Sequence, residues 1–381
     1  MKSTRVSQKN RLHIVCLDVP FPADYGGAID MFYRIRALHK LGYELVLHVF
    51  EYGRGKQQEL EKYGVVHYYQ RTRSLLHLLS TRPFIVQSRK NKRLLENLLK
   101  DDAPILFEGI HTAYSLENEA IQKRVTFVRM HNIEHEYYDG LKKNASFLRK
   151  LFFRQETNKL KNYQKILAKC SHILAITKAD AEKLKKINDR VSILPASVPE
   201  IEGSFTTVKR YALFHGNLSV PENEKAALWI IKTLKGVIDT TFPLIIAGKN
   251  PHKKLKDICA KNEIELIANP SERKMDQLVQ EAQIHVLYTA VPSGIKLKLL
   301  ACLHSSGHIL VNEQMVRGTA LDAFCIAALD AKDFKMHFIG LKSDVVSKDE
   351  FGKRAAFIGT YFNNTENCRQ IQQLIDHYEK H

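Results

Sequence analysis

Short apolar runs alternate with helix-like patterns along the whole chain of 381 residues. The first unit has a strand pattern at residues 12–18, a helix pattern at 28–41 and a second strand pattern at 44–50. Gly42 follows the helix pattern, as a C-terminal stop would. This spacing is that of a βαβ unit, in which a helix connects two parallel strands. The chain is therefore expected to fold as an α/β protein with mainly parallel sheets.

The alternation continues in two halves, which are separated by residues 195–210, a stretch without periodicity that we interpret as a linker. Further strand-like runs are residues 64–69, 104–108, 124–130, 172–177 and 190–194 in the first half, and 211–215, 243–247, 264–268, 284–288 and 308–312 in the second. Helices are expected at residues 223–234 and 275–283, with a helical tail over 348–378. The pattern predicts two α/β domains that face each other across a cleft.

The charge and the cysteine content of the chain limit the kinds of partner and the cellular compartment that we expect for it. The formal net charge of +17 predicts an acidic partner, which would be nucleic acid, an anionic membrane surface or a phosphorylated substrate. A solvated basic face without a dedicated partner is the alternative. No nucleic-acid-binding module is recognisable. Six cysteines without a CxxC pair fit reduced thiols in the cytoplasm, and no segment has the ~18 apolar residues that a membrane span requires.

Residues 291–312 read VPSGIKLKLLACLHSSGHILVN and lie between two of the strand-like runs. Ser293 is the expected N-cap of a helix over about 295–305, Gly294 permits close approach of a ligand, and Gly307 is the expected stop. The helix would begin at the carboxyl ends of the strands, where open α/β sheets bind ligands. An anion there would meet free N–H groups, the positive end of the helix dipole and a lysine, which favours a phosphate.

Four stretches together resemble one known family. They are PFPADYGGAIDMFYRIRALHKLGYEL, FHGNLSVPENEKAALWI, PLIIAGKNP and PSGIKLKLLACLHSSGHILVN. Their order and spacing resemble the retaining glycosyltransferases of family 4 (glycosyl transferases group 1), which have the GT-B fold of two Rossmann-like domains. The resemblance implies an acceptor-binding domain over residues 1–200, a nucleotide-sugar-binding domain over 201–360, and a C-terminal helix over 361–381 that packs back on the first domain.

The resemblance also implies a donor site in the second domain. Lys298 is the expected catalytic lysine, which contacts the donor phosphates and stabilises the charge that grows on the leaving group. The other expected donor-binding residues are Gly216, Asn217, Gly248, Lys249, Ser293, Gly294, Ile295 and Lys296. On a helix, Lys296 and Lys298 would lie about 200° apart, so they would not face one ligand equally. The alternative is two solvated lysines on a surface helix. No metal or other cofactor is expected.

In the first domain, Gly26 and Gly27 form the loop expected to contact the acceptor, although a plain turn would use the same residues. His131 follows a strand and is the second expected catalytic residue, for sugar binding or proton movement. Glu108 and His111 are expected to orient the acceptor, with buried structural roles as the alternative. Residues 131–135 also match H-x-x-E-H, a zinc-peptidase pattern that requires both histidines within one helix.

Basic and aromatic residues interleave at helical spacing over residues 142–169, and residues 82–100 add further positive charge. Such a helix can lie on an anionic membrane. In the alternative, its apolar face packs on the sheet and only the charges are exposed. We therefore expect a cytoplasmic protein, peripheral on the inner face of the membrane, with a glycan or lipid-linked acceptor.

The leading hypothesis is a retaining hexosyltransferase that uses a nucleotide-sugar donor. Ala301 stands where relatives carry the carboxylate that holds the donor ribose, and this motivates a second hypothesis. In that hypothesis the chain is a non-catalytic relative that binds a nucleotide sugar or serves as the partner of an active enzyme. A sugar-nucleotide epimerase of the same fold is a third hypothesis, and it predicts a product without an acceptor.

Overall fold

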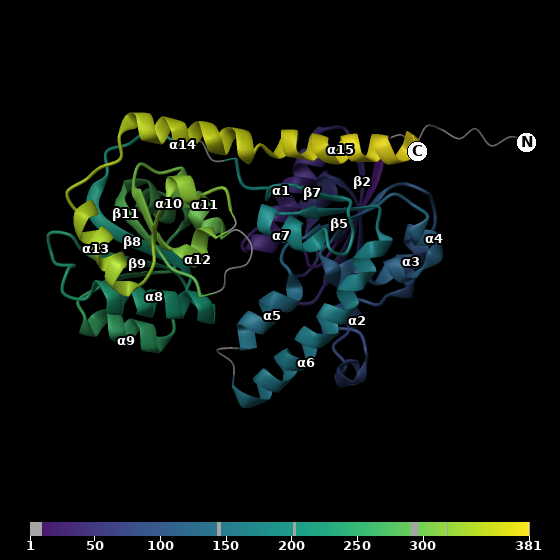
Figure 1. The fold of residues 1–381 in the computed structure, drawn as a ribbon, viewed down its shortest axis with the longest axis horizontal. Helices are drawn as coiled ribbons and strands as arrows, with labels where there is room; N and C mark the ends of the chain where they lie inside the picture. The colour runs from purple at the N-terminus through teal and green to yellow at the C-terminus, as the bar shows by residue number, and fades with distance from the viewer. Residues whose placement is uncertain (1–9, 143–145, 201–202, 291–295, 318, 381) are drawn as a thin grey trace, which may run out of the picture. The chain divides into compact units, whose positions relative to one another are not determined.

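The computed structural model describes residues 10–142, 146–200, 203–290, 296–317 and 319–380. The chain forms two compact units (Figure 1). Unit 1 comprises residues 1–199 and 362–381, and unit 2 comprises residues 200–361. The C-terminal segment therefore returns to the first unit after the second is complete.

Unit 1 is built on a seven-stranded sheet in the order β3-β2-β1-β4-β5-β6-β7, with every neighbouring pair parallel. The strands are β1 (Arg11–Cys16), β2 (Glu44–Glu51), β3 (Gly64–Gln70), β4 (Ile105–Glu108), β5 (Thr126–Met130), β6 (His172–Ala175) and β7 (Val191–Ile193). Because β1 and β4 are adjacent but not consecutive, the strand order reverses between them. The ends of these two strands mark the point where such sheets bind ligands.

Helices cover both faces of this sheet, and each face has its own apolar core. The helices are α1 (Gly26–Lys40), α2 (Phe84–Gln87), α3 (Lys92–Leu98), α4 (Glu119–Gln122), α5 (Glu134–Lys142), α6 (Phe147–Tyr163), α7 (Lys178–Leu184) and α15 (Asn364–Lys380), with 3-10 helices η1 (Gln58–Lys62), η2 (Leu75–Leu79), η3 (Ile110–Glu117) and η4 (Gln164–Lys169). On one face α1 packs with α15, which adds Cys368, Ile371 and Ile375 to the core.

Unit 2 has a six-stranded parallel sheet in the order β10-β9-β8-β11-β12-β13. Its strands are β8 (Lys209–Asn217), β9 (Leu244–Lys249), β10 (Glu265–Ala268), β11 (Ala282–Leu287), β12 (His308–Asn312) and β13 (Ile326–Ala328). Its helices are α8 (Pro221–Leu234), α9 (Lys253–Lys261), α10 (Glu272–Glu281), α11 (Leu297–Leu303), α12 (Glu313–Val316), α13 (Ala331–Leu341) and α14 (Lys348–Tyr361), with 3-10 helix η5 (Asp322–Phe324). Here the strand order reverses between β8 and β11.

The predicted fold class is confirmed, since both units are parallel α/β sheets and the ends of every predicted strand lie within two residues of the observed ones. The three-residue edge strand β13 was not predicted. The predicted helical tail over residues 348–378 is present, as the two helices α14 and α15. The side chain of Asn363 accepts a hydrogen bond from the Glu366 amide at the start of the second helix.

The predicted linker is wrong over its first residues. Residues 195–198 are buried in unit 1, where the Ser197 amide donates to Asp30 at 2.6 Å and Asn364 bonds both ways with the Val198 backbone. Polar groups that are buried require partners, and these backbone groups find them in α1 and α15. Within the described residues, no helix is both long enough and apolar enough to cross a membrane.

Candidate functional site

In unit 2, the carboxyl ends of β8 and β9 come together through two glycines. Gly216 pairs with Gly248, and Asn217 pairs with Lys249. A Cβ on Gly248 would lie 1.8 Å from the Gly216 carbonyl oxygen, so only glycine permits this approach. Four of the predicted donor-binding residues thus lie side by side at the predicted end of the sheet, next to the reversal of strand order.

Lys298 on α11 points to this same end. Its Nζ donates to Asn223 Oδ1 at 2.9 Å, and the Asn223 amide in turn donates to the Asn217 carbonyl at 2.9 Å. The Nζ also lies 5.1 Å from the centre of the Phe214 ring. Asn223, in the first turn of α8, therefore links the lysine to the β8 end. Sequence reasoning missed Asn223 as a site residue, although it lies within a stretch that carries the resemblance.

Burial lowers the pKa of the Lys298 ammonium from its usual value to about 8, because the charged form loses hydration. The neighbouring His215 is buried as well, and burial next to Lys298 lowers its pKa to about 4. Because His215 is neutral, it does not compensate the positive charge of Lys298. A bound anion would stabilise that charge. The alternative of a solvated surface lysine does not fit Lys298.

Lys296 lies near the same first turn of α8, with its Nζ 3.8 Å from Glu222 Oε1. The same oxygen of Glu222 accepts a hydrogen bond from the Thr289 hydroxyl at 2.5 Å. The two lysines do not both lie on the helix, as the expected separation of about 200° assumed. Lys296 precedes the helix with extended backbone angles, so the 100° step between helical residues does not apply to it. Glu222 and Thr289 are further polar residues that sequence reasoning missed here.

The helix itself is shorter than predicted. It runs from Leu297 to Leu303 with Lys296 as its N-cap, and the expected cap Ser293 lies outside the described residues. Gly307 is not its stop, because the helix ends at Leu303 with His304 as its C-cap. A Cβ on Gly307 would lie 2.3 Å from the Ala282 carbonyl oxygen, which explains the glycine. The predicted donor residues Ser293, Gly294 and Ile295 lie outside the described residues.

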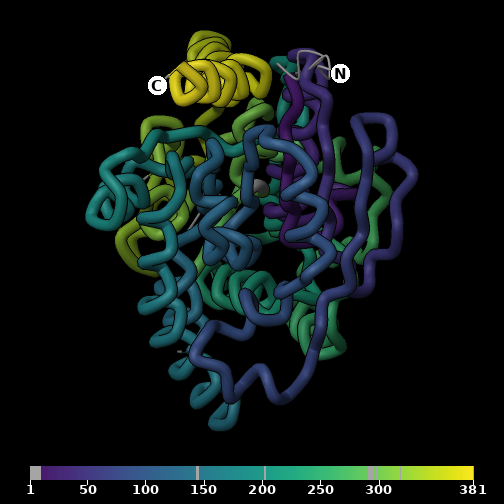
Figure 2. Tube along the Cα trace, turned by 90° about the vertical axis from the view of Figure 1, so that its right-hand side faces the viewer, coloured from purple at the N-terminus to yellow at the C-terminus, as the bar shows by residue number. Residues whose placement is uncertain are grey.

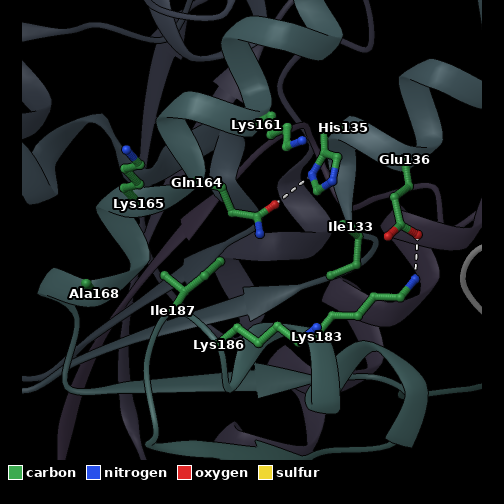
Figure 3. A pocket seen from close by; sticks show the side chains of 10 residues that line it. All are labelled: Ile133, His135, Glu136, Lys161, Gln164, Lys165, Ala168, Lys183, Lys186 and Ile187. Carbon is green, nitrogen blue, oxygen red and sulfur yellow. Dashed lines mark hydrogen bonds and ion pairs between the residues drawn. The ribbon is translucent and has the colours of Figure 1, made fainter.

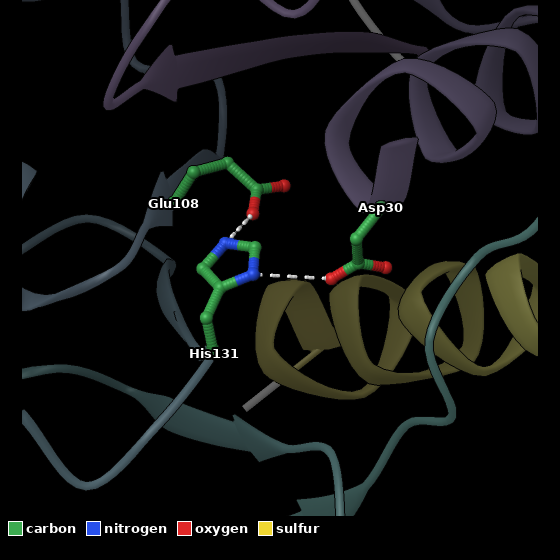
Figure 4. A group of neighbouring side chains, drawn as sticks. All are labelled: Asp30, Glu108 and His131. Atoms are coloured by element: carbon green, nitrogen blue, oxygen red, sulfur yellow. Dashed lines mark hydrogen bonds and ion pairs between the residues drawn. The ribbon is translucent and has the colours of Figure 1, made fainter. Parts of the chain in front are cut away.

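In unit 1, a buried cluster of charged side chains lies at the reversal between β1 and β4 (Figure 4). His131, just after β5, has Nε2 at 2.9 Å from Glu108 Oε2 and Nδ1 at 3.3 Å from Asp30 Oδ2. Two arginines complete the cluster. Arg34 lies 2.6 Å from Asp30 and 2.9 Å from Glu108, and Arg129 lies 3.2 Å from Asp30.

Charge balance sets the titration of this cluster. Burial alone would raise the pKa of Asp30, but Arg129, Arg34 and His131 hold it well below its usual value. Burial alone would lower the pKa of His131, but its bonds to Asp30 and Glu108 outweigh burial and raise it. Side-chain atoms of Asp30, Glu108 and His131 that could coordinate a metal ion lie within 4.8 Å of one another. The guanidinium groups of Arg34 and Arg129 already neutralise these carboxylates, so the cluster suits an ion-pair network better than a metal ion.

Gly26 and Gly27 form the first turn of α1, which starts beside the cluster. The N-cap residue Tyr25 makes no side-chain capping bond, and its hydroxyl donates instead to Asp18 at 2.9 Å. A Cβ on Gly27 would lie 3.1 Å from the Tyr25 ring. The glycines therefore fit a tight loop-to-helix entry whose first backbone N–H groups have no side-chain cap at Tyr25.

Glu108 is fully buried and its bonds are made within the cluster, so its geometry fits the structural alternative. His111 Nε2 lies 3.9 Å from Glu134 Oε2, and burial holds the pKa of His111 well below its usual value. Burial raises the pKa of Glu134 to about 7. A carboxyl group that titrates near neutrality is a candidate acid–base. Sequence reasoning noted Glu134 only within H-x-x-E-H.

That zinc-peptidase pattern does not assemble. His131 precedes α5, which begins at Glu134, so His131 and His135 do not share a helix. Their partners differ as well, because His135 Nδ1 lies 2.9 Å from Gln164 Oε1 while both ring nitrogens of His131 face Asp30 and Glu108.

A separate open pocket of about 610 Å³ lies elsewhere in unit 1, between α5, η4 and α7 (Figure 3). Its lining includes four lysines, namely Lys161, Lys165, Lys183 and Lys186. Lys183 pairs with Glu136 at 2.5 Å. None of the predicted site residues lines this pocket, so it is separate from the two sites described above.

Solved structures share this architecture over nearly the whole chain. A glycosyltransferase from Rickettsia africae ESF-5 matches with a TM-score of 0.66 at 14% identity, covering 97% of this chain and 98% of that one. TarM of S. aureus, solved with UDP and α-GlcNAc-glycerol, gives 0.67 at 11% identity, with 96% and 99% covered. Anabaena HepE, solved with UDP and glucose, gives 0.63 at 10% identity, again with 96% and 99% covered. The fold is therefore GT-B.

Sequence comparison adds one relative. An uncharacterized 44.6 kDa protein in the cps region of Klebsiella pneumoniae is 24% identical over 366 residues, which cover 91% of this chain and 94% of that protein. No family model matches the chain.

Proposed function

We propose that this protein is a retaining glycosyltransferase of the family 4 type, which moves a sugar from a nucleoside diphosphate donor to a glycan acceptor. One observation carries the proposal. Lys298, a poorly solvated cation, is held by Asn223 at the carboxyl end of a parallel sheet, where the strand order reverses. That position suits a diphosphate, because an anion restores to the ammonium the stabilisation that burial removed.

The chemistry follows from where charge develops. When the bond between the sugar and the diphosphate breaks, negative charge grows on the leaving oxygen. A cation already in place lowers the barrier, since it does not have to reorganise during the step. Lys298 would supply this charge, with Lys296 as a second cation. The chain would need no metal or other cofactor for this role.

The acceptor is proposed to bind at the carboxyl end of the unit 1 sheet. Solved GT-B structures with UDP and with glycan-like ligands support a donor and an acceptor as partners. Gly26 and Gly27 would let a sugar approach the backbone, and Glu134 would exchange a proton near neutral pH. His131, whose ring nitrogens both face carboxylates, would hold the site in shape and would move a proton only after one of these bonds opens.

Turnover tests the proposal. Purified protein is incubated with a panel of sugar nucleotides and glycan acceptors, and nucleoside diphosphate release is measured. We expect release with one donor, lowered at least about 100-fold by Lys298→Ala, the scale for losing one charge-stabilising group. The matched control is Lys256→Ala, the same change at an exposed lysine of α9. Equal loss in both variants, or full activity in Lys298→Ala, would contradict the assigned role.

A second candidate function is a non-catalytic binder of nucleotide sugars. Ala301, half-buried on α11, motivates it, because it offers no carboxylate to a ribose. This candidate predicts nucleotide binding that depends on Lys298 without release of diphosphate across the panel. Product that forms without an acceptor would instead indicate an epimerase.

A further inference from the structure

Six large apolar side chains are exposed together on unit 1, and we name this group the apolar tip. Its members are Leu75, Leu76 and Leu79 on η2, and Phe147, Leu148 and Leu151 on α6. The exposed fractions are 81% for Leu75, 83% for Leu79, 75% for Phe147 and 77% for Leu148. Scattered exposed leucines are ordinary, but six large apolar side chains exposed on two neighbouring elements indicate an interaction surface.

The two elements that form the apolar tip lie side by side. Gln155 and Lys159 of α6 both donate to the Leu78 carbonyl of η2, at 3.3 and 2.8 Å. Both views show η2 beside α6 at one end of unit 1 (Figures 1 and 2). The inner side of α6 is already packed, since Phe152 contacts Phe84 and Phe153 contacts Tyr138. The tip is therefore the outer face of a helix whose inner face already has a partner.

The charged residues of the two segments that form the apolar tip have one sign. Residues 71–82 and 146–155 contain Arg71, Arg73, Arg82, Arg149, Lys150 and Arg154, and no Asp or Glu. Of these, Arg73, Arg149, Lys150 and Arg154 are exposed. A comparable apolar group in unit 2, formed by Leu329, Met336 and Ile339, lies next to Asp330 and Asp333 as well as lysines. The tip in unit 1 thus combines apolar exposure with purely positive segments, whereas the group in unit 2 does not.

We infer that the apolar tip docks the protein on an anionic lipid bilayer. The leucines and phenylalanines enter the boundary between headgroups and acyl chains, and the arginines and lysine meet the lipid phosphates. A second copy of this chain is a poor occupant, because self-association through the tip would bring two cationic rims together. The docking goes beyond the proposed transfer reaction, and only its use in reaching a lipid-linked acceptor rests on that proposal.

Vesicle sedimentation with the full chain tests the docking without any donor or acceptor. We expect binding to vesicles of phosphatidylcholine with about 30% phosphatidylglycerol, and binding at least about tenfold weaker to phosphatidylcholine alone, since several cations contribute. The variant Leu75→Ser/Leu76→Ser/Leu79→Ser and the variant Phe147→Ser/Leu148→Ser/Leu151→Ser should each weaken partitioning about tenfold or more. Arg149→Gln/Lys150→Gln/Arg154→Gln should remove most of the preference for the anionic lipid.

The matched control is Leu329→Ser/Met336→Ser/Ile339→Ser, which removes three exposed apolar side chains of unit 2 and should bind like the wild type. All replaced side chains are exposed, so circular dichroism and the melting temperature should stay unchanged. The inference is overturned if the wild type does not bind anionic vesicles, or if the tip variants bind as well as the control. It is also overturned if the wild type forms a dimer that the tip variants abolish. Vesicle binding without sugar transfer would leave this inference standing and contradict only the proposed function.

Discussion

Two arginines, two carboxylates and a histidine share one buried cluster in unit 1, in which Asp30 and Glu108 are each paired with more than one basic side chain. Their separation in sequence explains why the cluster was not predicted. Glu108 and His131 stand out because they follow strands, but Asp30 and Arg34 lie within the helix pattern of α1 and read there as ordinary polar positions. Only the folded chain brings Arg129 to Asp30.

Replacing Glu108 with glutamine tests this network. Glu108→Gln keeps the size of the side chain but leaves Arg34 and His131 facing a neutral amide. We expect a loss of about 3 kcal/mol in the free energy of unfolding, measured by urea denaturation. The control is Glu59→Gln at the exposed pair with Lys62, which should leave the urea midpoint unchanged. Equal midpoints for both variants would show that the buried network does not stabilise unit 1.

Gly248 gives a second test at the residue scale, through the strand ends that hold the proposed donor site. Gly248→Ala would place a Cβ against the Gly216 carbonyl oxygen and should disrupt the β8–β9 ends. We expect a destabilisation of about 2 kcal/mol. Gly340→Ala on α13 is the matched control, because open space surrounds that position and alanine favours a helix. It should be neutral or stabilise by up to about 1 kcal/mol. The same direction in both variants would contradict this account of Gly248.

Among the elements, the strands were the most predictable and the helix ends the least. Apolar runs of five to seven residues located twelve strands, because a strand buried on both faces of a sheet is mostly apolar. Helix α11 began later than expected, since a serine and a glycine are compatible with many loop shapes. The exposed 3-10 helix η2 was missed, because the pattern LLHLL is as apolar as a buried strand.

Helix α15 is the element whose contacts make the sharpest prediction. It belongs to unit 1 although unit 2 precedes it in the chain, and Ile371 is fully buried against the α1 side of the sheet. Ile371→Ala should cost about 3 kcal/mol and lower hydrogen-exchange protection in α1 but not in α8. Ile339→Ala, at a half-exposed site on α13, should change stability by less than about 0.5 kcal/mol. If hydrogen-exchange protection were lost in α8 and kept in α1, the assignment of α15 to unit 1 would be contradicted.

At the scale of the whole molecule, the sequence was sufficient for the class of fold but not for the boundary of the units. Alternating strand and helix patterns in two halves predict two parallel sheets, and the structure has them. The return of residues 362–381 to unit 1 leaves no local signal, and it was expected only from the family resemblance. The proposed donor and acceptor sites each lie where strand order reverses, which topology alone favours for ligand binding.

Titration of nucleoside diphosphates across pH tests the central claim most directly. Because the pKa of Lys298 is about 8 in the free protein, an anion that binds beside it must favour the protonated form and raise that pKa. Affinity measured by calorimetry should therefore weaken as pH rises from 8 to 9.5, by up to about tenfold per pH unit, with proton uptake on binding. In Lys298→Arg the cation cannot lose its proton, so binding should persist without this pH dependence. Absence of binding by any nucleoside diphosphate, or the same pH dependence in both proteins, would contradict the claim.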